Sequence, residues 1–286
     1  MTRDPIVPAP ANVNRLRGAI ATAAKHRGAT LKRFQALIGN VVVSQMLPDS
    51  AVKGGTGLKL RFGDSITRET PDLDTAFRGD REAFLDELSG RLSDGWGGFA
   101  GSAIAGELRA PAELRNRIGD SYIMQPVRVK LSYKGRDFMS VELEVGHDEL
   151  EATTNEPVET VMSDEVLEVF AELGLLEPAP VRVLPLHHQI SQKLHACTEP
   201  ESNRAHDLVD LQLLIPDADV QLVSETAQRL FRFRNHHTWP PELEAGPDWQ
   251  GLYNEAAADL DVLPLDEAVD WVNDYIHQLA IFEVAE

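Results

Sequence analysis

Two aspartates separated by one residue, Asp72 and Asp74, have the type and spacing of metal ligands. Residues two apart in a strand face the same side, with Cα atoms about 6.6–7 Å apart. Carboxylates placed in this way can share Mg²⁺, which takes oxygen ligands and keeps water and substrate phosphates in its shell. A third acid from a neighbouring hairpin, Glu144 or Glu142, would complete a two-metal clamp for displacement at phosphorus. The alternative is an exposed polar strand face, because acid pairs of this spacing arise often in a chain with 46 acidic residues.

The motif Lys53-Gly54-Gly55-Thr56 stands at the end of an apolar stretch and the start of a predicted helix. Its glycines would let the backbone approach an anion, and a helix N-terminus supplies N–H donors and positive potential. These features favour a phosphate-binding turn. A plain strand-to-helix turn would have the same composition, so the motif alone leaves both interpretations open.

A third group of charged residues follows much later in the chain. Arg204, Asp207 and Asp210 stand three residues apart and line one face of a predicted helix, and Lys193 lies on the helix before it. A lysine and an arginine directed at a triphosphate would neutralise charge on the departing pyrophosphate. The alternative is a surface ion pair between helix neighbours, which contributes only about 0.2–0.5 kcal/mol.

Histidine and cysteine bind metals in many proteins, but their spacing in this chain does not predict a metal site. The pairs His187-His188 and His236-His237 are adjacent, so their side chains point to different sides of a helix or strand. The single cysteine, Cys197, excludes an internal disulfide and a cysteine-based zinc site. We expect Cys197 to be a buried packing residue.

The composition is that of a globular protein. The chain has 286 residues, of which 43% are hydrophobic and 26% are charged. No apolar run approaches the ~20 residues of a membrane helix, and the N-terminal residues lack the basic-then-apolar pattern of a secretion signal. Together with the single cysteine, this predicts a cytoplasmic protein that does not enter a membrane.

The charge is unevenly distributed along the chain. The formal net charge is −19, with +7 over residues 1–136 and −26 over residues 137–286. A basic front half can bind a polyanion that an acidic back half repels. The residues expected to contact an RNA backbone lie in the two predicted N-terminal helices and are Arg15, Arg17, Lys25, Arg27, Lys32 and Arg33.

Hydrophobic periodicity predicts the elements that must position these residues, and the fold class that they indicate is α+β. Helices are expected at residues 30–46, 58–62 and 81–92, a strand at 72–77, and a hairpin with one buried face at 126–145. From residue 163 to the end the pattern is helical. The expected domains are N-terminal helices (1–48), a mixed core (49–150) and a helical C-terminal domain (151–286).

Taken in chain order, four segments resemble the AbiEii/AbiGii-type toxin nucleotidyltransferases, in particular the mycobacterial MenT branch. They are Lys53-Gly54-Gly55-Thr56, the segment from Arg68 to Asp74, Lys193, and the segment from Arg204 to Asp210. The resemblance covers roughly residues 30–215. It implies a nucleotidyltransferase-fold core with a mixed sheet and a toxin with a cognate antitoxin protein. It also implies that the toxin uses NTP and two Mg²⁺ ions to add nucleotides to the 3′ end of tRNA, which blocks aminoacylation and translation.

The resemblance also implies a role for each matching residue. Gly54 and Gly55 would hold the nucleotide phosphates, Lys193 would contact the triphosphate, and Asp207 would be a further essential acid. Further nucleotide-binding residues would be Lys53, Thr56, Arg68, Thr70 and Arg204. The metal ligands would be Asp72, Asp74 and Glu144. Thr70 stands where most of the family has serine.

Three alternatives remain open at this stage. The same fold could nucleotidylate a protein hydroxyl or a small molecule. The chain could be a catalytically inactive nucleotide-binding module that holds a partner. It could also be an acidic α+β protein whose carboxylates are all on the surface.

Overall fold

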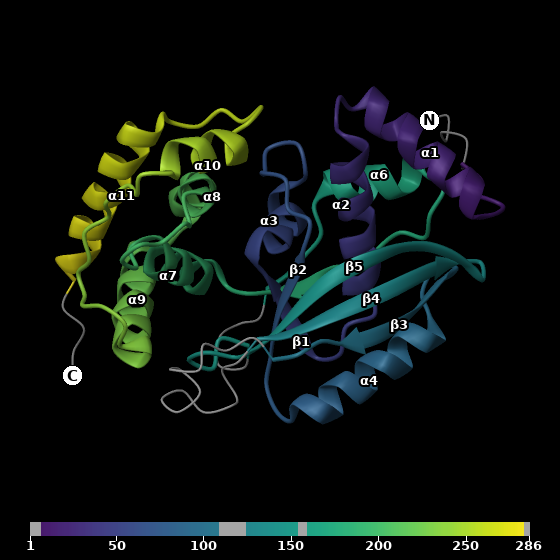
Figure 1. Cartoon of the computed structure of the whole chain (residues 1–286), viewed down its shortest axis with the longest axis horizontal. Coiled ribbons are helices and arrows are strands. Elements are labelled where there is room, and N and C mark those ends of the chain that lie inside the picture. Colours follow the sequence, from purple (N-terminus) through teal and green to yellow (C-terminus); the bar gives the residue numbers. More distant parts are fainter. Residues whose placement is uncertain (1–6, 109–123, 154–158, 283–286) are drawn as a thin grey trace. The chain divides into compact units, whose positions relative to one another are not determined.

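The computed structural model describes residues 7–108, 124–153 and 159–282, which form two compact units (Figure 1). The first unit takes its residues from 1–65, 69–148 and 157–183, and the second from 66–68, 149–156 and 184–286. These limits differ from the expected boundaries after residues 48 and 150. The difference arises because the N-terminal helices and the chain up to residue 183 pack with the sheet.

The first unit contains a mixed sheet of seven described strands, in the order β3-β4-β5-β2-β1-β7-β6. The strands are β1 (Ser50–Lys53), β2 (Leu73–Phe77), β3 (Phe99–Ala105), β4 (Gln125–Tyr133), β5 (Arg136–His147), β6 (Glu159–Val161) and β7 (Val181–Val183). Strand β2 is antiparallel to β1 and parallel to β5, so it lies at the centre of the mixed arrangement. The α+β fold class is therefore confirmed.

Helices of the first unit cover one face of this sheet. They are α1 (Val13–His26), α2 (Leu31–Ser44), α3 (Gly54–Phe62), α4 (Arg81–Asp94) and α6 (Asp164–Glu172). On α2, Gly39 lies against Met139 and Val141 of β5, and on α4, Leu92 lies against Gly101 of β3. The strand registers place these contacts on the same side of the sheet. The other side carries polar and more exposed residues.

The second unit is helical. Its helices are α7 (Leu186–Cys197), α8 (His206–Leu214), α9 (Val220–Arg234), α10 (Trp249–Ala256) and α11 (Leu265–Ala280). Apolar residues on the inner faces of α8 and α11, such as Leu208, Leu211 and Ile276, are fully buried. In the described part of the chain, no helix is both long and apolar enough to cross a membrane.

Three local expectations need correction. The stretch after residue 163 is not helical throughout, because Val181–Val183 forms β7 and pairs in parallel with β1. Helix α3 begins at Gly54 rather than near residue 58. Asp72 precedes β2 instead of lying within it. The hairpin expected at residues 126–145 is confirmed as β4 and β5.

Candidate active site

Three charged residues form a row across the centre of the sheet. Lys53 on β1 is the register partner of Asp74 on β2, and Asp74 is the register partner of Glu144 on β5. Register partners on neighbouring strands lie about 4.8 Å apart and face the same side. All three residues are half-buried. The sheet therefore brings an ammonium and two carboxylates together at the end of β1, where the glycine turn begins.

The glycine turn lies directly against two predicted site residues. A Cβ atom at Gly54, which has a φ of +61°, would overlap the Asp74 carboxylate oxygen Oδ2. A Cβ atom at Gly55 would overlap the Thr70 hydroxyl. Both side chains occupy space that only a glycine leaves open. The turn also opens α3, whose first backbone N–H groups have no partner within the helix.

Thr70 carries an unsatisfied polar atom at this turn. Its side chain is only 5% exposed, and within the described chain its hydroxyl oxygen has no hydrogen-bond partner. Buried hydroxyls without a partner are rare, and each needs an explanation such as an absent water, ion or ligand. The Thr70 hydroxyl beside Gly55 is therefore consistent with a site for a polar ligand.

Asp72 is fixed through its backbone. The Thr56 hydroxyl donates to the Asp72 carbonyl oxygen at 2.8 Å, and Asn40 Nδ2 donates to the same oxygen at 3.2 Å. Asn40 Nδ2 also donates to Thr56 Oγ1 at 3.0 Å. The Thr56 hydroxyl is thus engaged inside the protein. Sequence reasoning missed Asn40, because a single asparagine on an apolar helix face carries no motif.

Of the two acids proposed for the hairpin, the structure places Glu144 beside Asp74. Glu142 is exposed and pairs with Arg128 across the hairpin at 2.7 Å. Among the described residues, no group of three or more His, Cys, Asp or Glu side chains is arranged to hold a metal ion. Asp72, Asp74 and Glu144 therefore do not form a preassembled three-carboxylate cage.

Ion pairs anchor the loop between α3 and Asp72. The Asp64 carboxylate contacts Lys59 Nζ at 2.5 Å and Arg33 Nε at 2.9 Å, and all three side chains are largely buried. Further along the loop, Glu69 pairs with Lys32 at 3.2 Å. Carboxylates with buried cationic partners are costly to separate, so the Asp64 pairs hold the start of the loop in place, whereas the exposed Lys32–Glu69 pair adds little.

The same pairs change the expectation for RNA binding by the N-terminal helices. Besides Lys32 and Arg33, Arg17 donates to two carbonyl groups of β5, and Arg27 pairs with Glu172 at 3.1 Å. Four of the six basic residues thus have acceptors on the protein itself. These four side chains should therefore attract RNA phosphates less strongly than the sequence alone predicts.

The second unit contains a separate buried charge cluster. Lys193 Nζ contacts Asp207 Oδ1 at 2.7 Å and Asp210 Oδ2 at 2.6 Å. Arg204 pairs with Asp207 at 2.8 Å, and Arg68 pairs with Asp210 at 3.0 Å. Both carboxylates and the ammonium are almost fully buried. Asp210, which the sequence analysis singled out only by its spacing from Asp207, accepts hydrogen bonds from both Lys193 and Arg68.

Lys193 and Asp207 hold each other in their charged forms. Burial opposes the Lys193 ammonium, but the Asp207 and Asp210 carboxylates outweigh burial and raise its pKa. Burial likewise opposes the Asp207 carboxylate, but Lys193 and Arg204 outweigh it and lower the Asp207 pKa. For His206, burial dominates and lowers the pKa to about 4, so the imidazole is neutral at pH 7. Three cations therefore surround two carboxylates, which leaves one net positive charge.

Within the described residues, the histidines and the cysteine form no group arranged to hold a metal ion. The His187 and His188 rings lie in contact, with centroids 4.5 Å apart and planes tilted by 44°, so the two side chains do not point to different sides as expected. Burial is the main cause that lowers the pKa of His188 to about 3. Cys197 is 2% exposed, and burial raises the pKa of its thiol. The expectation that Cys197 is a packing residue is confirmed.

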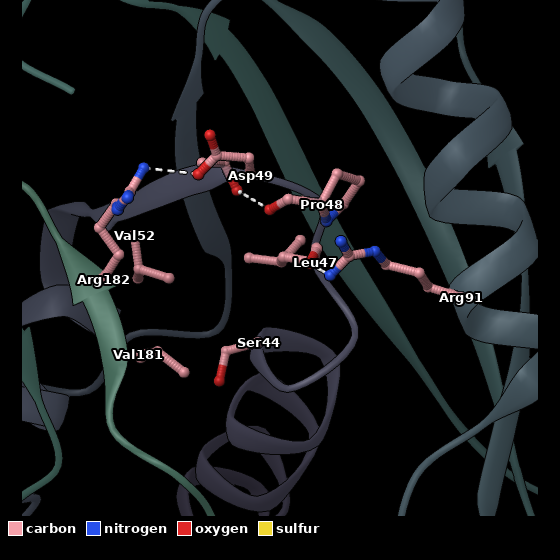
Figure 2. Close-up of a pocket in the computed structure, with 9 residues that line it drawn as sticks. Ser44, Leu47, Pro48, Asp49, Val52, Arg91, Val181 and Arg182 are labelled. Carbon is pink, nitrogen blue, oxygen red and sulfur yellow. Dashed lines mark hydrogen bonds and ion pairs between the residues drawn. The ribbon is translucent and has the colours of Figure 1, made fainter. Parts of the chain in front are cut away.

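A small cavity lies at the opposite end of β1 (Figure 2). It has a volume of about 280 Å³, and its polar lining includes Ser44, Arg91 and Arg182. Figure 2 shows Arg182 pointing to Asp49, with which it forms an exposed ion pair. No predicted site residue is among those that line this cavity, to which β1 contributes Ser50 and Val52.

Comparisons with known proteins identify a family and similar solved structures. The family model described as "Nucleotidyl transferase AbiEii toxin, Type IV TA system" matches residues 35–274. Among solved structures, the nucleotidyltransferase toxin MenT4 from Mycobacterium tuberculosis H37Rv matches with a TM-score of 0.50 and 15% identity, over 93% of this chain and 99% of that one. JHP933 from Helicobacter pylori matches with a TM-score of 0.42 and 17% identity, over 85% and 88%.

No curated protein sequence matches the chain. The similarity to MenT4 supports the fold, because its low sequence identity carries no more than that. The family match covers most of the chain and includes all the predicted site residues. The chain therefore belongs to the AbiEii family of toxin nucleotidyltransferases.

Proposed function

We propose that this chain is a Mg²⁺-dependent toxin that transfers nucleotides from NTP to the 3′ end of tRNA and so blocks aminoacylation and translation. Membership of the AbiEii family supports nucleotidyl transfer and an antitoxin partner. The observation that carries the proposal is the Asp74 carboxylate packed against the Gly54-Gly55 turn, beside the buried Thr70 hydroxyl. Because tRNA and NTP are cytoplasmic, we propose that the toxin acts in the cytoplasm.

The donor set fits magnesium. Asp72, Asp74 and Glu144 offer only carboxylate oxygens, and Mg²⁺ is usually held by one or two carboxylates together with water and substrate phosphates. An arrangement without a complete protein cage is consistent with that preference. Two bound Mg²⁺ ions would lower the pKa of the attacking hydroxyl and neutralise charge on the phosphates.

The residues of the first unit then have distinct roles. Backbone N–H groups of the Gly54-Gly55 turn and the Thr70 hydroxyl donate to phosphate oxygens, and Lys53 offsets phosphate charge from the neighbouring strand. The bond that forms joins the 3′ oxygen of the acceptor to the α-phosphorus. The bond that breaks releases pyrophosphate, and the hydroxyl proton passes to solvent. Thr56 acts through its contact with Asp72.

For the second unit, we propose that Lys193, Arg68 and Arg204 bind phosphate charge of the nucleotide. Asp207 holds the Lys193 ammonium charged and oriented, and Asp210 orients the Arg68 guanidinium by accepting its hydrogen bond. The net positive charge of the cluster suits an anionic ligand. Such catalysis rests on positioning and electrostatic stabilisation.

Labelled NTPs with Mg²⁺ and either total RNA or a protein lysate test the proposal. We expect label at the 3′ end of tRNA with the wild type, none with Asp74→Asn, and full labelling with the matched control Glu142→Gln. Label on protein alone would show a different acceptor. If no substrate is labelled and Asp72→Ala still inhibits growth, the chain is an inactive binding module.

A further inference from the structure

Asn40 lies outside the candidate active site but forms hydrogen bonds with two of its segments. It lies on α2, is 1% exposed, and donates through Nδ2 to both Thr56 Oγ1 and the Asp72 carbonyl oxygen. Thr56 follows the Gly54-Gly55 turn directly, and Asp72 stands two residues before Asp74. One amide group thus connects the glycine turn with the segment that carries the acids.

The orientation of the amide follows from its partners. The Asp72 carbonyl oxygen can only accept, so the atom facing it must be the nitrogen of Asn40. The other amide atom, Oδ1, is consequently left buried, and within the described chain it has no hydrogen-bond partner. A buried acceptor without a donor is destabilising, and an apolar side chain of similar size would avoid that loss. The presence of Asn40 is therefore not explained by stability alone.

The residue before Asn40 fixes the distance between α2 and the sheet. The preceding residue is Gly39, where a Cβ atom would come within 2.9 Å of Met139 and Val141 on β5. The missing side chain lets α2 approach the sheet closely. The helix cannot move toward the strand any further, so the Asn40 amide stands at a fixed distance from the start of β2.

We propose that Asn40 is a positioning residue, which sets the separation between the glycine turn and the Asp72–Asp74 segment. The inference rests on the proposed function, because it assumes that phosphate and metal bind at these two places. Displacement of reacting groups by about 1 Å can lower a rate about 100-fold. The Thr56–Asp72 bond remains when Asn40 is replaced, so we expect a smaller loss, of about 10-fold in kcat.

The test compares Asn40→Leu with the wild type. Leucine has the same branching of heavy atoms as asparagine and removes both donors. We expect kcat for nucleotide transfer to tRNA to fall about 10-fold, KM for NTP to change less than threefold, and the melting temperature to stay the same or rise. Thr56→Val, which removes the second donor to Asp72, should show the same pattern. The matched control is Ser44→Ala, one turn further along α2, whose hydroxyl donates to the Val41 carbonyl oxygen.

A second measurement separates this inference from the proposed function. Mn²⁺ is titrated into each protein with an equimolar mixture of the four NTPs and no RNA, and binding is followed by magnetic resonance of the metal. We expect Asn40→Leu to bind Mn²⁺ about 10-fold more weakly than the wild type. If the wild type transfers no nucleotide, the proposed function fails and this titration still decides the role of Asn40. Unchanged metal affinity, or a loss that accompanies a lower melting temperature in both variants, overturns the inference.

Discussion

Replacement of Gly54 by alanine adds a single methyl group next to the Asp74 carboxylate of the candidate site. Gly54 has a φ of +61°, in the left-handed region, and its missing Cβ leaves room for the Asp74 carboxylate. The added methyl group would overlap Asp74 Oδ2 and come within 3.1 Å of its Cγ. The substitution therefore imposes a backbone cost and displaces a proposed metal ligand.

The two effects have different magnitudes and different readouts. A non-glycine residue in the left-handed region costs about 1–2 kcal/mol of stability. Oδ2 ends a short, rotatable side chain, so it can move away by on the order of 1 Å without much further loss. A shift of that size in a catalytic group can lower the rate about 100-fold. We expect a modest loss of stability and a large loss of activity.

Gly28→Ala is the matched control. Gly28 has a φ of +69°, and nothing lies within 4 Å of the position of its Cβ atom. Urea denaturation should give both variants the same loss of about 1–2 kcal/mol, whereas nucleotide transfer should fall only in Gly54→Ala. Equal activities for the two variants would refute the reasoning, and so would full activity of Gly54→Ala.

Three further results are expected. Lys193→Met should lower the free energy of unfolding by about 3 kcal/mol, measured in urea, because the buried Asp207 loses its main counter-charge; a loss below 1 kcal/mol would contradict this. His188 and His195 have folded-state pKa values of about 3 because of burial. They bind protons on unfolding below pH ~6.5, so stability should fall from there toward pH 3 by up to ~1.4 kcal/mol per pH unit for each histidine, and His195→Phe should reduce that slope. Cys197 should react with an aromatic disulfide reagent only as the protein unfolds; rapid reaction with the native protein would contradict its burial.

Much of the fold could be predicted from the sequence, because a long alternating pattern of apolar residues indicates a strand and a long helical pattern indicates a helix. The β4–β5 hairpin and the strand before Phe77 are examples. Strand β7 was missed, since three residues are too few to show alternation and its pairing with β1 depends on distant residues. The start of α3 was placed too late, because glycines disfavour helix and only the packing of Gly54 and Gly55 shows why they begin one.

The residues of the candidate site that could be proposed from the sequence are those whose type and spacing indicate metal or phosphate binding. Residue type and spacing singled out Lys193, Asp207 and Asp210, but their pairing with one another needed the structure. Asn40 could not be found, because its role lies in a contact with a backbone carbonyl and not in its chemistry. The choice of Glu144 over Glu142 likewise required the register between β2 and β5.

The parallel pairing of β2 with β5 has a consequence for synthesis on the ribosome. A nascent chain that has emerged only as far as Phe77 contains the glycine turn and both aspartates, but the neighbour of β2 that carries Glu144 has not been made. At about 5–20 residues per second, several seconds pass before β5 is complete. The row of Lys53, Asp74 and Glu144 is therefore completed only after most of the sheet has been synthesised.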